Sequence, residues 1–384
     1  MRKCIDITLR YMLSTFNKII PKKNIILFNS FPAYCDNSWE LYVYILNNRP
    51  DIIERFDIYW GVNDTESLPK YAAGIPVNVL NKKSFMGIWY FFWAKYIFTT
   101  HGYFGGIKAS HNQSIVNLWH GCGYKTISQA ERTFVGNYNI VTSEVYRKIH
   151  KDVFNLKENQ IFITGLPRND LFFDKKDALA LLGINKSDYK KILIWMPTYR
   201  KAAFGHDGID GDKKSFGLAS LTKDDYEVLN KILLKNHILL IIKPHPMDSL
   251  NLKNIDQLSN IISFTTDDLL NKGIKLYSVL KDTDGLLSDY SSVIVDYLIL
   301  DKPIAMVLSD AEEYKKSRGF VFEDVKEYFP GPVISNTSEF VRYIERFDDV
   351  NEKWIDKRKS ITKAFHKYID NKNCQRVCDI FFPR

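Results

Sequence analysis

Residues 285–297 read Gly-Leu-Leu-Ser-Asp-Tyr-Ser-Ser-Val-Ile-Val-Asp-Tyr, and this stretch decides the fold class. Its apolar start, 285–287, is typical of a buried strand, and the apolar residues from about 291 to 300 predict a helix. The polar turn between them supplies the hydroxyl and carboxylate side chains that prefer the first position of a helix. A strand that leads through a tight turn into a helix is the repeating unit of α/β folds.

The same unit recurs around this stretch in the second half of the chain. Apolar runs at 191–196, 237–242 and 303–308 predict strands, and 224–235 predicts a helix. Strands that are apolar throughout are buried on both faces, as in a parallel sheet covered by helices.

The first half has the same rhythm and predicts a second doubly wound domain. Its expected strands are 24–28, 56–60, 96–99 and 115–119, and its expected helices are 38–47 and 85–94. We therefore expect an α/β protein of two tandem Rossmann-like domains with a cleft between them. The predicted ranges are 1–178, 179–350 and a helical, basic segment 351–384 that packs back on the first domain.

Composition narrows the classes of partner. The chain has 384 residues, a net charge of +8 and 54 aromatic residues (25 Phe, 22 Tyr, 7 Trp), which suits anionic substrates and membrane interfaces. Without a dense Lys/Arg cluster or a recognition module, nucleic acid is not expected. The five cysteines lack zinc-site spacing, and an early acidic residue argues against a cleaved secretory signal.

Two segments could contact a membrane, although neither is long enough to span one. Residues 2–23 have apolar side chains at helical spacing with basic residues between them, and residues 85–94 form an aromatic run flanked by lysines. Both segments fit a surface helix and a core helix equally, so the two interpretations stay open.

Because ligands of parallel sheets bind beyond the carboxyl ends of strands, polar residues after apolar runs are candidate site residues. His120 ends such a run and is followed by Gly121 and Gly123, which allow a tight turn. A histidine here can take a proton from an attacking hydroxyl. The alternative is a buried histidine that stabilises a loop.

Lys243 and His245 follow a second run, and prolines on both sides of His245 hold the chain extended. Two cations on a rigid strand end can bind phosphate, although a plain strand terminator would have the same pattern.

Asp289, Ser291 and Ser292 follow the strand of the opening stretch. Hydroxyls and free backbone N–H groups at a helix start can bind an anion, although ordinary helix capping accounts for at least one hydroxyl.

Two further loops contain an arginine, whose planar guanidinium suits oxyanions. They contribute Arg168 in one loop and Thr198 and Arg200 in the other. Either loop could equally be solvated or form a salt bridge between domains. The chain has no Walker loop, dinucleotide fingerprint, nucleophile elbow or zinc-protease pattern, which excludes the common ATPases, dehydrogenases and serine hydrolases.

Taken in order, these segments resemble the teichoic-acid glycerophosphotransferases, which use CDP-glycerol or CDP-ribitol. The resemblance is carried by residues 30–37, 119–121, 167–170, 197–200, 243–246, 288–292, 301–303, 317–320 and 330–332. It implies the GT-B fold with a C-terminal helix that crosses back to the first domain. One departure is Cys122-Gly123-Tyr124 before Lys125, where the family usually has Thr-Pro-Leu.

The resemblance implies that His120 is the general base and that His245, Ser291 and Ser292 bind the donor pyrophosphate. From the residues themselves we add Lys243, Arg168, Arg200, Thr198 and Asp289 on the donor side, and we assign Gly121, Lys125 and Asp36 to the acceptor side.

The expected reaction transfers glycerol phosphate or ribitol phosphate to a hydroxyl of a lipid-linked or polymeric glycan and releases CMP, without a metal or cofactor. We expect the enzyme in the cytoplasm, bound peripherally to the inner face of the membrane. Alternatives are a GT-B glycosyltransferase that uses a CMP-sugar and a glycan-binding protein without catalytic activity.

Overall fold

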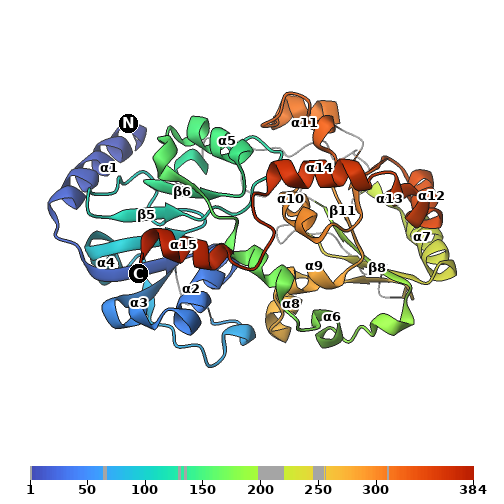
Figure 1. The fold of residues 1–384 in the computed structure, drawn as a ribbon, viewed down its shortest axis with the longest axis horizontal. Helices are drawn as coiled ribbons and strands as arrows, with labels where there is room; N and C mark the ends of the chain where they lie inside the picture. The colour runs from blue at the N-terminus through green and yellow to red at the C-terminus, as the bar shows by residue number, and fades with distance from the viewer. Residues whose placement is uncertain are drawn as a thin grey trace. The chain divides into compact units, whose positions relative to one another are not determined.

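The structure is a computed structural model that describes residues 2–63, 67–128, 131–133, 136–197, 220–244, 255, 257–308 and 311–384. The chain divides into two compact units (Figure 1). Unit 1 comprises Met1–Cys122, Ile127–Phe173 and Phe365–Arg384, and unit 2 comprises Gly123–Thr126 and Asp174–Ala364. The domain ranges that we predict from the sequence stay predictions beside this division by contacts.

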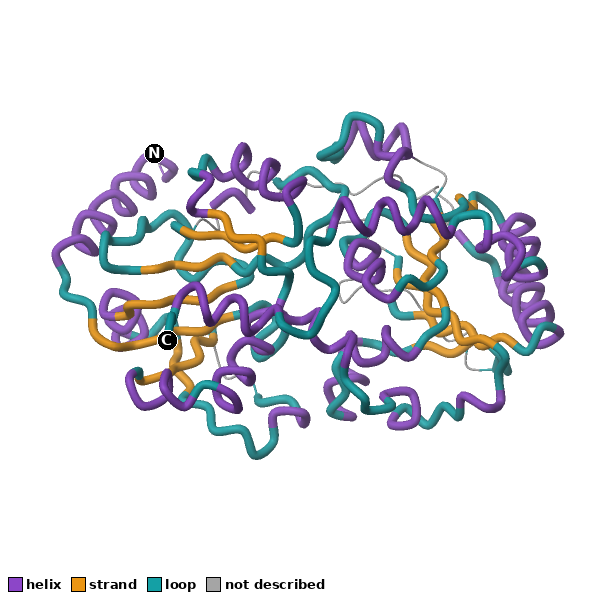
Figure 2. Tube along the Cα trace, viewed as in Figure 1, coloured by secondary structure: helices purple, strands orange, loops and turns teal. Residues whose placement is uncertain are grey.

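Unit 1 contains a parallel sheet of seven strands in its described part, in the order β3-β2-β1-β4-β5-β6-β7. Figure 2 draws the strands in orange and the helices in purple. The strands are β1 (Lys23–Asn29), β2 (Asp57–Val62), β3 (Val79–Asn81), β4 (Ala94–Thr99), β5 (Ser114–Asn117), β6 (Tyr138–Val141) and β7 (Ile161–Ile163). The helices are α1 (Arg2–Ile19), α2 (Asp36–Asn48), α3 (Pro50–Arg55), α4 (Phe85–Trp93), α5 (Glu144–Phe154) and α15 (Asn373–Phe381).

Strand β1 shows how the sheet of unit 1 is covered on both faces. Ile25 and Leu27 pack in one core cluster with side chains of α1 and α4. Ile26 and Phe28 pack in another with side chains of α2 and α15. Successive side chains of a strand point to opposite faces, so an uninterrupted apolar strand fits this double burial.

The last helix, α15, completes the core of unit 1. Cys374, Val377 and Cys378 are buried in the cluster that contains α2. The carboxylate of Asp170 accepts hydrogen bonds from the backbone N–H groups of Asn373 (3.0 Å) and Cys374 (2.9 Å). A carboxylate at this place satisfies donors that have no partner within the helix.

Within its described residues, unit 2 contains a parallel six-stranded sheet in the order β10-β9-β8-β11-β12-β13. Its strands are β8 (Lys191–Met196), β9 (Ile238–Ile242), β10 (Ile261–Ser263), β11 (Gly285–Ser288), β12 (Ile304–Val307) and β13 (Val333–Ile334). Its helices are α6 (Ala178–Leu181), α7 (Lys223–Lys235), α8 (Thr266–Lys272), α9 (Leu276–Asp282), α10 (Val293–Tyr297), α11 (Ala311–Ser317), α12 (Thr337–Glu345), α13 (Phe347–Glu352) and α14 (Ile355–Phe365).

Counted within each unit, both sheets contain the strand order 3-2-1-4-5-6, which is that of the Rossmann fold, and unit 1 adds a seventh strand. The predicted α/β class and the two Rossmann-like domains are therefore confirmed. In this order the strand sequence reverses between β1 and β4 in unit 1 and between β8 and β11 in unit 2. Ligands of such sheets bind beyond the carboxyl ends of the strands near this reversal.

The C-terminal region differs from the single helical segment that the sequence suggests. Helices α14 and α15 are separated by residues 366–372, which are not helical. The Asp370 side chain accepts a hydrogen bond from the Lys372 backbone N–H (3.0 Å), a local turn that competes with helix formation. The Lys367 N–H donates to the Thr142 carbonyl instead of a helical partner (2.9 Å).

The two segments with membrane-like patterns form α1 and α4, and these helices pack on one another. The ring of Phe16 lies 5.1 Å from that of Phe92 and 5.9 Å from that of Trp89. One side of each helix thus belongs to the core. Within the described residues, none of the helices has both the length and the apolar character required to cross a bilayer.

Candidate active site

A sharp turn after β5 presents His120. Trp119 has a positive φ of 57°, which is rare for a bulky residue, and Gly121 has a φ of 135°, which favours glycine. The Asn117 side chain supports the turn by accepting a hydrogen bond from the Trp119 N–H (3.0 Å). Such backbone strain persists only where the surroundings hold the residue in place.

The turn is held through its carbonyl groups. The buried Asn37 amide donates to the carbonyls of Leu118 (3.2 Å) and Trp119 (2.8 Å). The Arg168 guanidinium donates to the His120 carbonyl (3.0 Å) and pairs with the Asp36 carboxylate (2.8 Å). We call these three side chains, Asp36, Asn37 and Arg168, the carbonyl clamp.

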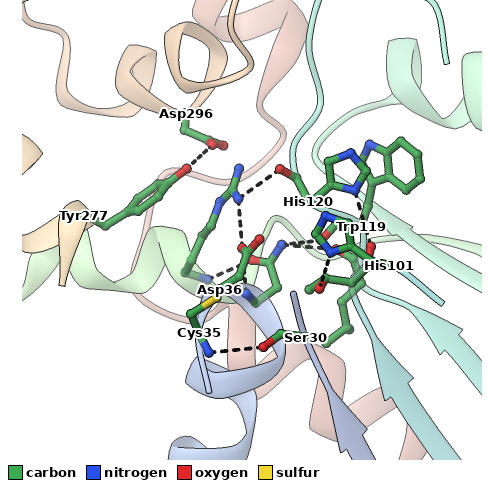
Figure 3. Close-up of polar contacts among 12 residues, drawn as sticks. Ser30, Cys35, Asp36, His101, Trp119, His120, Tyr277 and Asp296 are labelled. Atoms are coloured by element: carbon green, nitrogen blue, oxygen red, sulfur yellow. Dashed lines mark hydrogen bonds and ion pairs between the residues drawn. The ribbon is translucent and has the colours of Figure 1, made fainter. Parts of the chain in front are cut away.

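The clamp is itself connected and buried. The Arg168 backbone N–H donates to the Asn37 side-chain oxygen (3.1 Å), and the Asn37 N–H donates to Asp36 (2.7 Å). Only 8% of the Arg168 side chain and 14% of the Asp36 side chain is exposed. The clamp therefore fixes the backbone of His120 and leaves its imidazole to other partners (Figure 3).

The imidazole of His120 lies among aromatic and charged groups. Its Nδ1 is 3.3 Å from the Thr100 carbonyl, and its Nε2 is 3.4 Å from Glu131 Oε1. The His101 ring stacks on it, with centroids 4.4 Å apart and planes 15° from parallel (Figure 3). A quarter of the His120 side chain is exposed, so a substrate can reach the ring.

The ionisable neighbours of His120 have shifted pKa values. Burial, and then the charge of His120, lowers the pKa of His101 to about 4 and that of buried His150 to about 3. Burial opposes the charge of Glu131, but hydrogen bonds with His120 and Ser128 outweigh it and lower its pKa to about 2. Near neutral pH the surroundings of His120 thus hold two neutral imidazoles and one carboxylate.

In unit 2 the polar residues after β11 form a turn into the short helix α10. The Ser288 hydroxyl donates to the Met196 carbonyl (2.5 Å), and Asp289 is buried. Ser291 Oγ accepts a long hydrogen bond from the Val293 N–H (3.4 Å), and Ser292 makes no side-chain cap. These two serines are half-buried, so their hydroxyls lie at the surface of unit 2.

Lys243 is buried and follows strand β9, which is separated from β11 by β8 in the sheet. Its Nζ donates to the Thr266 hydroxyl (3.1 Å) and the Pro244 carbonyl (3.3 Å). Burial lowers its pKa to about 8. A desolvated ammonium with neutral acceptors attracts an anion more strongly than a solvated one.

The segment Gly123–Thr126 belongs to unit 2, although it follows His120 by only a few residues. Lys125 forms an antiparallel bridge with Phe320, and the Tyr124 hydroxyl donates to the Tyr328 carbonyl (3.0 Å). A Cβ on Gly123 would lie 3.1 Å from Cβ of Ser292 and 3.2 Å from its Cα. Glycine at 123 thus lets this segment approach the turn before α10.

The structure places the predicted site residues in two groups. His120, Gly121, Asp36 and Arg168 lie together in unit 1, whereas Lys125, Lys243, Asp289, Ser291 and Ser292 lie in unit 2. Thr198, Arg200 and His245 lie outside the described residues. The predicted roles at the donor and the acceptor remain predictions. Among the residues that the structure describes, no three His, Cys, Asp or Glu side chains are grouped to hold a metal ion.

Sequence reasoning missed three neighbours of His120. Asn37 lies in the first resembling segment, but no role was assigned to it, and His101 follows strand β4, so the strand-end rule could have found it. Glu131 lies on a short 3-10 turn (Glu131–Thr133) away from any strand end, where sequence gives no signal.

The sequence model of the CDP-glycerol:poly(glycerophosphate) glycerophosphotransferases matches residues 11–383. The chain belongs to this family. A relative of similar length is the teichoic acid glycerol-phosphate transferase of Staphylococcus aureus, with 24% identity over 100% of this chain and 98% of that protein.

Two other relatives are longer than this chain. The teichoic acid ribitol-phosphate polymerase TarL of S. aureus is 26% identical over 74% of this chain and 50% of its own length. The chain spans about half the length of this relative, and 45% of the poly(ribitol-phosphate) polymerase of Bacillus spizizenii.

The fold of the family is seen in the wall teichoic acid polymerase TagF, with a TM-score of 0.74, 20% identity and coverage of 97% of this chain and 92% of that one. A His-to-Asn variant of TagF soaked with CDPG also matches, with a TM-score of 0.71, 19% identity and coverage of 97% and 92%. These likenesses confirm the predicted fold.

Proposed function

We propose that the protein is a CDP-alditol phosphotransferase that moves glycerol phosphate or ribitol phosphate onto a glycan hydroxyl and releases CMP. Family membership supports the reaction class, and the relatives named for glycerol phosphate and ribitol phosphate support both donors. The observation that carries the proposal is the His120 turn: a partly exposed imidazole with its backbone fixed by the carbonyl clamp.

In the proposed mechanism, His120 takes the proton of the acceptor hydroxyl as the oxygen attacks the β-phosphorus of the donor. The bond from this phosphorus to the CMP oxygen breaks, and CMP leaves with the electron pair. Phosphoryl transfer depends mainly on positioning and charge stabilisation. Lys243, Ser291 and Ser292 of unit 2 would offset the charge on the donor phosphates, with no metal ion required.

The direct test measures CMP release by the purified protein with CDP-glycerol, CDP-ribitol and a CMP-sugar, each with lipid-linked acceptors. We expect release from one or both CDP-alditols, and unchanged rates after addition of a chelator. Release from the CMP-sugar alone would favour the alternative, a GT-B glycosyltransferase. Binding of glycan with no release from any donor would favour a non-catalytic protein.

We also propose that unit 1 binds the surface of an anionic membrane, such as the cytoplasmic leaflet, where a lipid-linked acceptor would lie. Helices α1 and α4 pack together, yet they expose apolar side chains on their outer sides. These are Leu9, Tyr11, Met12, Ile19, Phe85, Met86 and Ile88. Exposed Lys18, Lys23 and Lys83 are near them in sequence, a combination typical of helices that lie in the headgroup region.

Sedimentation with vesicles tests this surface. The wild-type protein should sediment with phosphatidylglycerol vesicles at low salt and much less with phosphatidylcholine vesicles. A Met12→Ser/Phe85→Ser variant should lose most of this binding, while Val228→Ser, at an exposed apolar residue of α7 in unit 2, should retain it. Equal sedimentation of all three proteins would contradict the proposal.

A further inference from the structure

Both ring nitrogens of His120 face oxygen atoms that accept hydrogen bonds. The Thr100 carbonyl is 3.3 Å from Nδ1, and a Glu131 carboxylate oxygen is 3.4 Å from Nε2. A neutral imidazole has only one N–H group, so it can donate to only one of them. Neither oxygen can donate, and the tautomer that the proposed base requires is the one with the proton on Nδ1: it donates to Thr100 and leaves the lone pair on Nε2 for the hydroxyl proton.

That tautomer makes Nε2 the atom that accepts a proton, and Glu131 lies beside it. The distance of 3.4 Å is longer than the usual N–H···O separation of about 2.9 Å, so the contact is loose. An acceptor hydroxyl can therefore compete for Nε2. Once Nε2 is protonated, the ring is a cation next to a carboxylate, and the pair attracts.

The position of Glu131 is supported by its own turn. Its Oε2 accepts a hydrogen bond from the Ser128 N–H (2.7 Å), and its backbone N–H donates to Ser128 Oγ (3.2 Å). This reciprocal pair is the arrangement of a capping box. One carboxylate oxygen is thus held by the backbone while the other points to His120, with 22% of the Glu131 side chain exposed.

We propose that Glu131 is the positioning residue of the His120 base, and that its carboxylate receives the Nε2–H of the imidazolium that forms during transfer. This role rests on the proposed function. The proton moves from the acceptor hydroxyl to Nε2 as the oxygen–phosphorus bond forms, and CMP leaves with the electrons of the broken bond. The imidazolium then pairs with Glu131 until it releases its proton to solvent after the products leave.

The other groups that face His120 do not replace Glu131 in this role. His101 stacks on the ring and is half-buried, and His150 packs against Trp119 and is fully buried. Burial lowers the pKa of both below neutral pH, so both imidazoles stay neutral there. Asp36 and Arg168 carry opposite charges, and they pair with each other. Glu131 is the carboxylate that contacts the imidazole within the described residues.

The kinetic test compares Glu131→Gln with the wild type over pH 5–9, with the donor at saturation. Without the carboxylate the imidazolium is less stable, so we expect kcat to fall roughly ten- to hundredfold at its plateau. His120 must be unprotonated to act as a base, and a neutral glutamine at position 131 stabilises the imidazolium less than the carboxylate does. The acidic limb of the profile should therefore move to lower pH.

Two further variants separate this role from a structural one. Glu131→Asp keeps the charge. Its rate should lie between those of Glu131→Gln and the wild type, and its acidic limb should lie closer to the wild-type pH. Glu144→Gln is the matched control, because Glu144 is 60% exposed and pairs with Arg147, three residues on in α5. It should leave both rate and profile unchanged. A lower rate in Glu131→Gln with an unmoved acidic limb would overturn the proposal.

A second readout does not depend on the proposed activity. The chain has eight histidines, and the NMR signal of the His120 ring can be assigned by its loss in His120→Gln. In Glu131→Gln the midpoint of this signal should move to lower pH, because the carboxylate that pairs with the charged ring is lost. An unchanged midpoint would refute the pairing even if no donor supports activity, whereas a moved midpoint without CMP release would count against the proposed function alone.

Discussion

The two units have the same strand order but hold their candidate site residues in different ways. In unit 1 the His120 turn is fixed by buried side chains that hold three successive carbonyls, at the cost of a strained φ at Trp119. In unit 2 the turn at Ser291 and Ser292 is only half-buried, and the buried Lys243 follows a different strand of the same sheet. A proton acceptor needs exact placement, whereas a diphosphate needs charge and donors. The predictions below test this difference.

The largest effect should come from His120 itself. Replacement by alanine removes the proton acceptor, so CMP release should fall by about 10²–10⁴-fold. The free energy of unfolding should change little, because a quarter of the side chain is exposed and the carbonyl clamp holds the backbone. Rates of CMP release and urea unfolding curves measure the two effects. Undiminished transfer would place the base elsewhere.

Breaking the carbonyl clamp should reduce both stability and activity. Arg168→Met removes the guanidinium that pairs with the Asp36 carboxylate and donates to the His120 carbonyl in a largely buried site. We expect a loss of about 3 kcal/mol in the free energy of unfolding by urea denaturation, together with a lower kcat. The double variant Asp36→Asn/Arg168→Met should recover part of the stability. An Arg168→Met protein as stable as the wild type would contradict the clamp.

In unit 2, Lys243→Met should separate stability from function. The folded-state pKa of Lys243 is lowered from 10.5 to about 8 by burial, so between these pH values the unfolded chain binds more protons. The wild type should therefore gain stability from this group as pH rises through that window. Below pH 8, Lys243→Met should be more stable by up to about 3 kcal/mol, and it should bind the donor less tightly.

Urea denaturation of both proteins at pH 7 and pH 10 measures the free energy of unfolding. Only the wild type should gain stability from this group as the pH rises. The difference between the two proteins should narrow as the pH increases. A difference that is the same at both pH values would mean that Lys243 is not the group responsible.

The smallest effect should come from Gly123→Ala. The added Cβ would lie 3.1 Å from Cβ of Ser292, so a shift of a few tenths of an ångström at the turn should cost about 1 kcal/mol and raise the KM for the donor. Gly183→Ala is the control. Its φ of 83° makes alanine costly there, but nothing lies within 4 Å of the added Cβ. If KM for the donor rises equally in both variants, the rise in Gly123→Ala comes from lost stability and not from the contact with Ser292.

Periodicity in the sequence predicts the long buried strands well. The runs Ile25–Phe28 and Ile238–Ile242 are apolar throughout, and both form central strands. Strands β3, β7, β10 and β13 have two or three residues each, too few for a periodic pattern, and tertiary pairing alone defines them. The break between α14 and α15 depends on a side-chain turn at Asp370 that helix propensity does not reveal.

The candidate site was predictable where it follows a strand. His120, Lys243 and the serines after β11 were found by that rule. The groups that support His120 were not, because Asn37 holds the preceding carbonyls from a helix start and Glu131 contacts the ring from a short 3-10 turn, neither of which directly follows a strand. Arg168 was predicted on the donor side, and only the coordinates reveal that its guanidinium holds Asp36 and the His120 carbonyl.

The turn that contains Arg168 also contains Asp170, which caps α15 at the other end of the chain. Domains usually fold in the order in which the ribosome makes them. Here the core around α2 lacks Val377 and Phe381 until the strands of unit 2, which precede them in the sequence, have been synthesised. The proposed base would thus gain its complete support last, after the strands of unit 2 have been made, so that a nascent chain with an unfinished second unit would also have an unfinished catalytic turn.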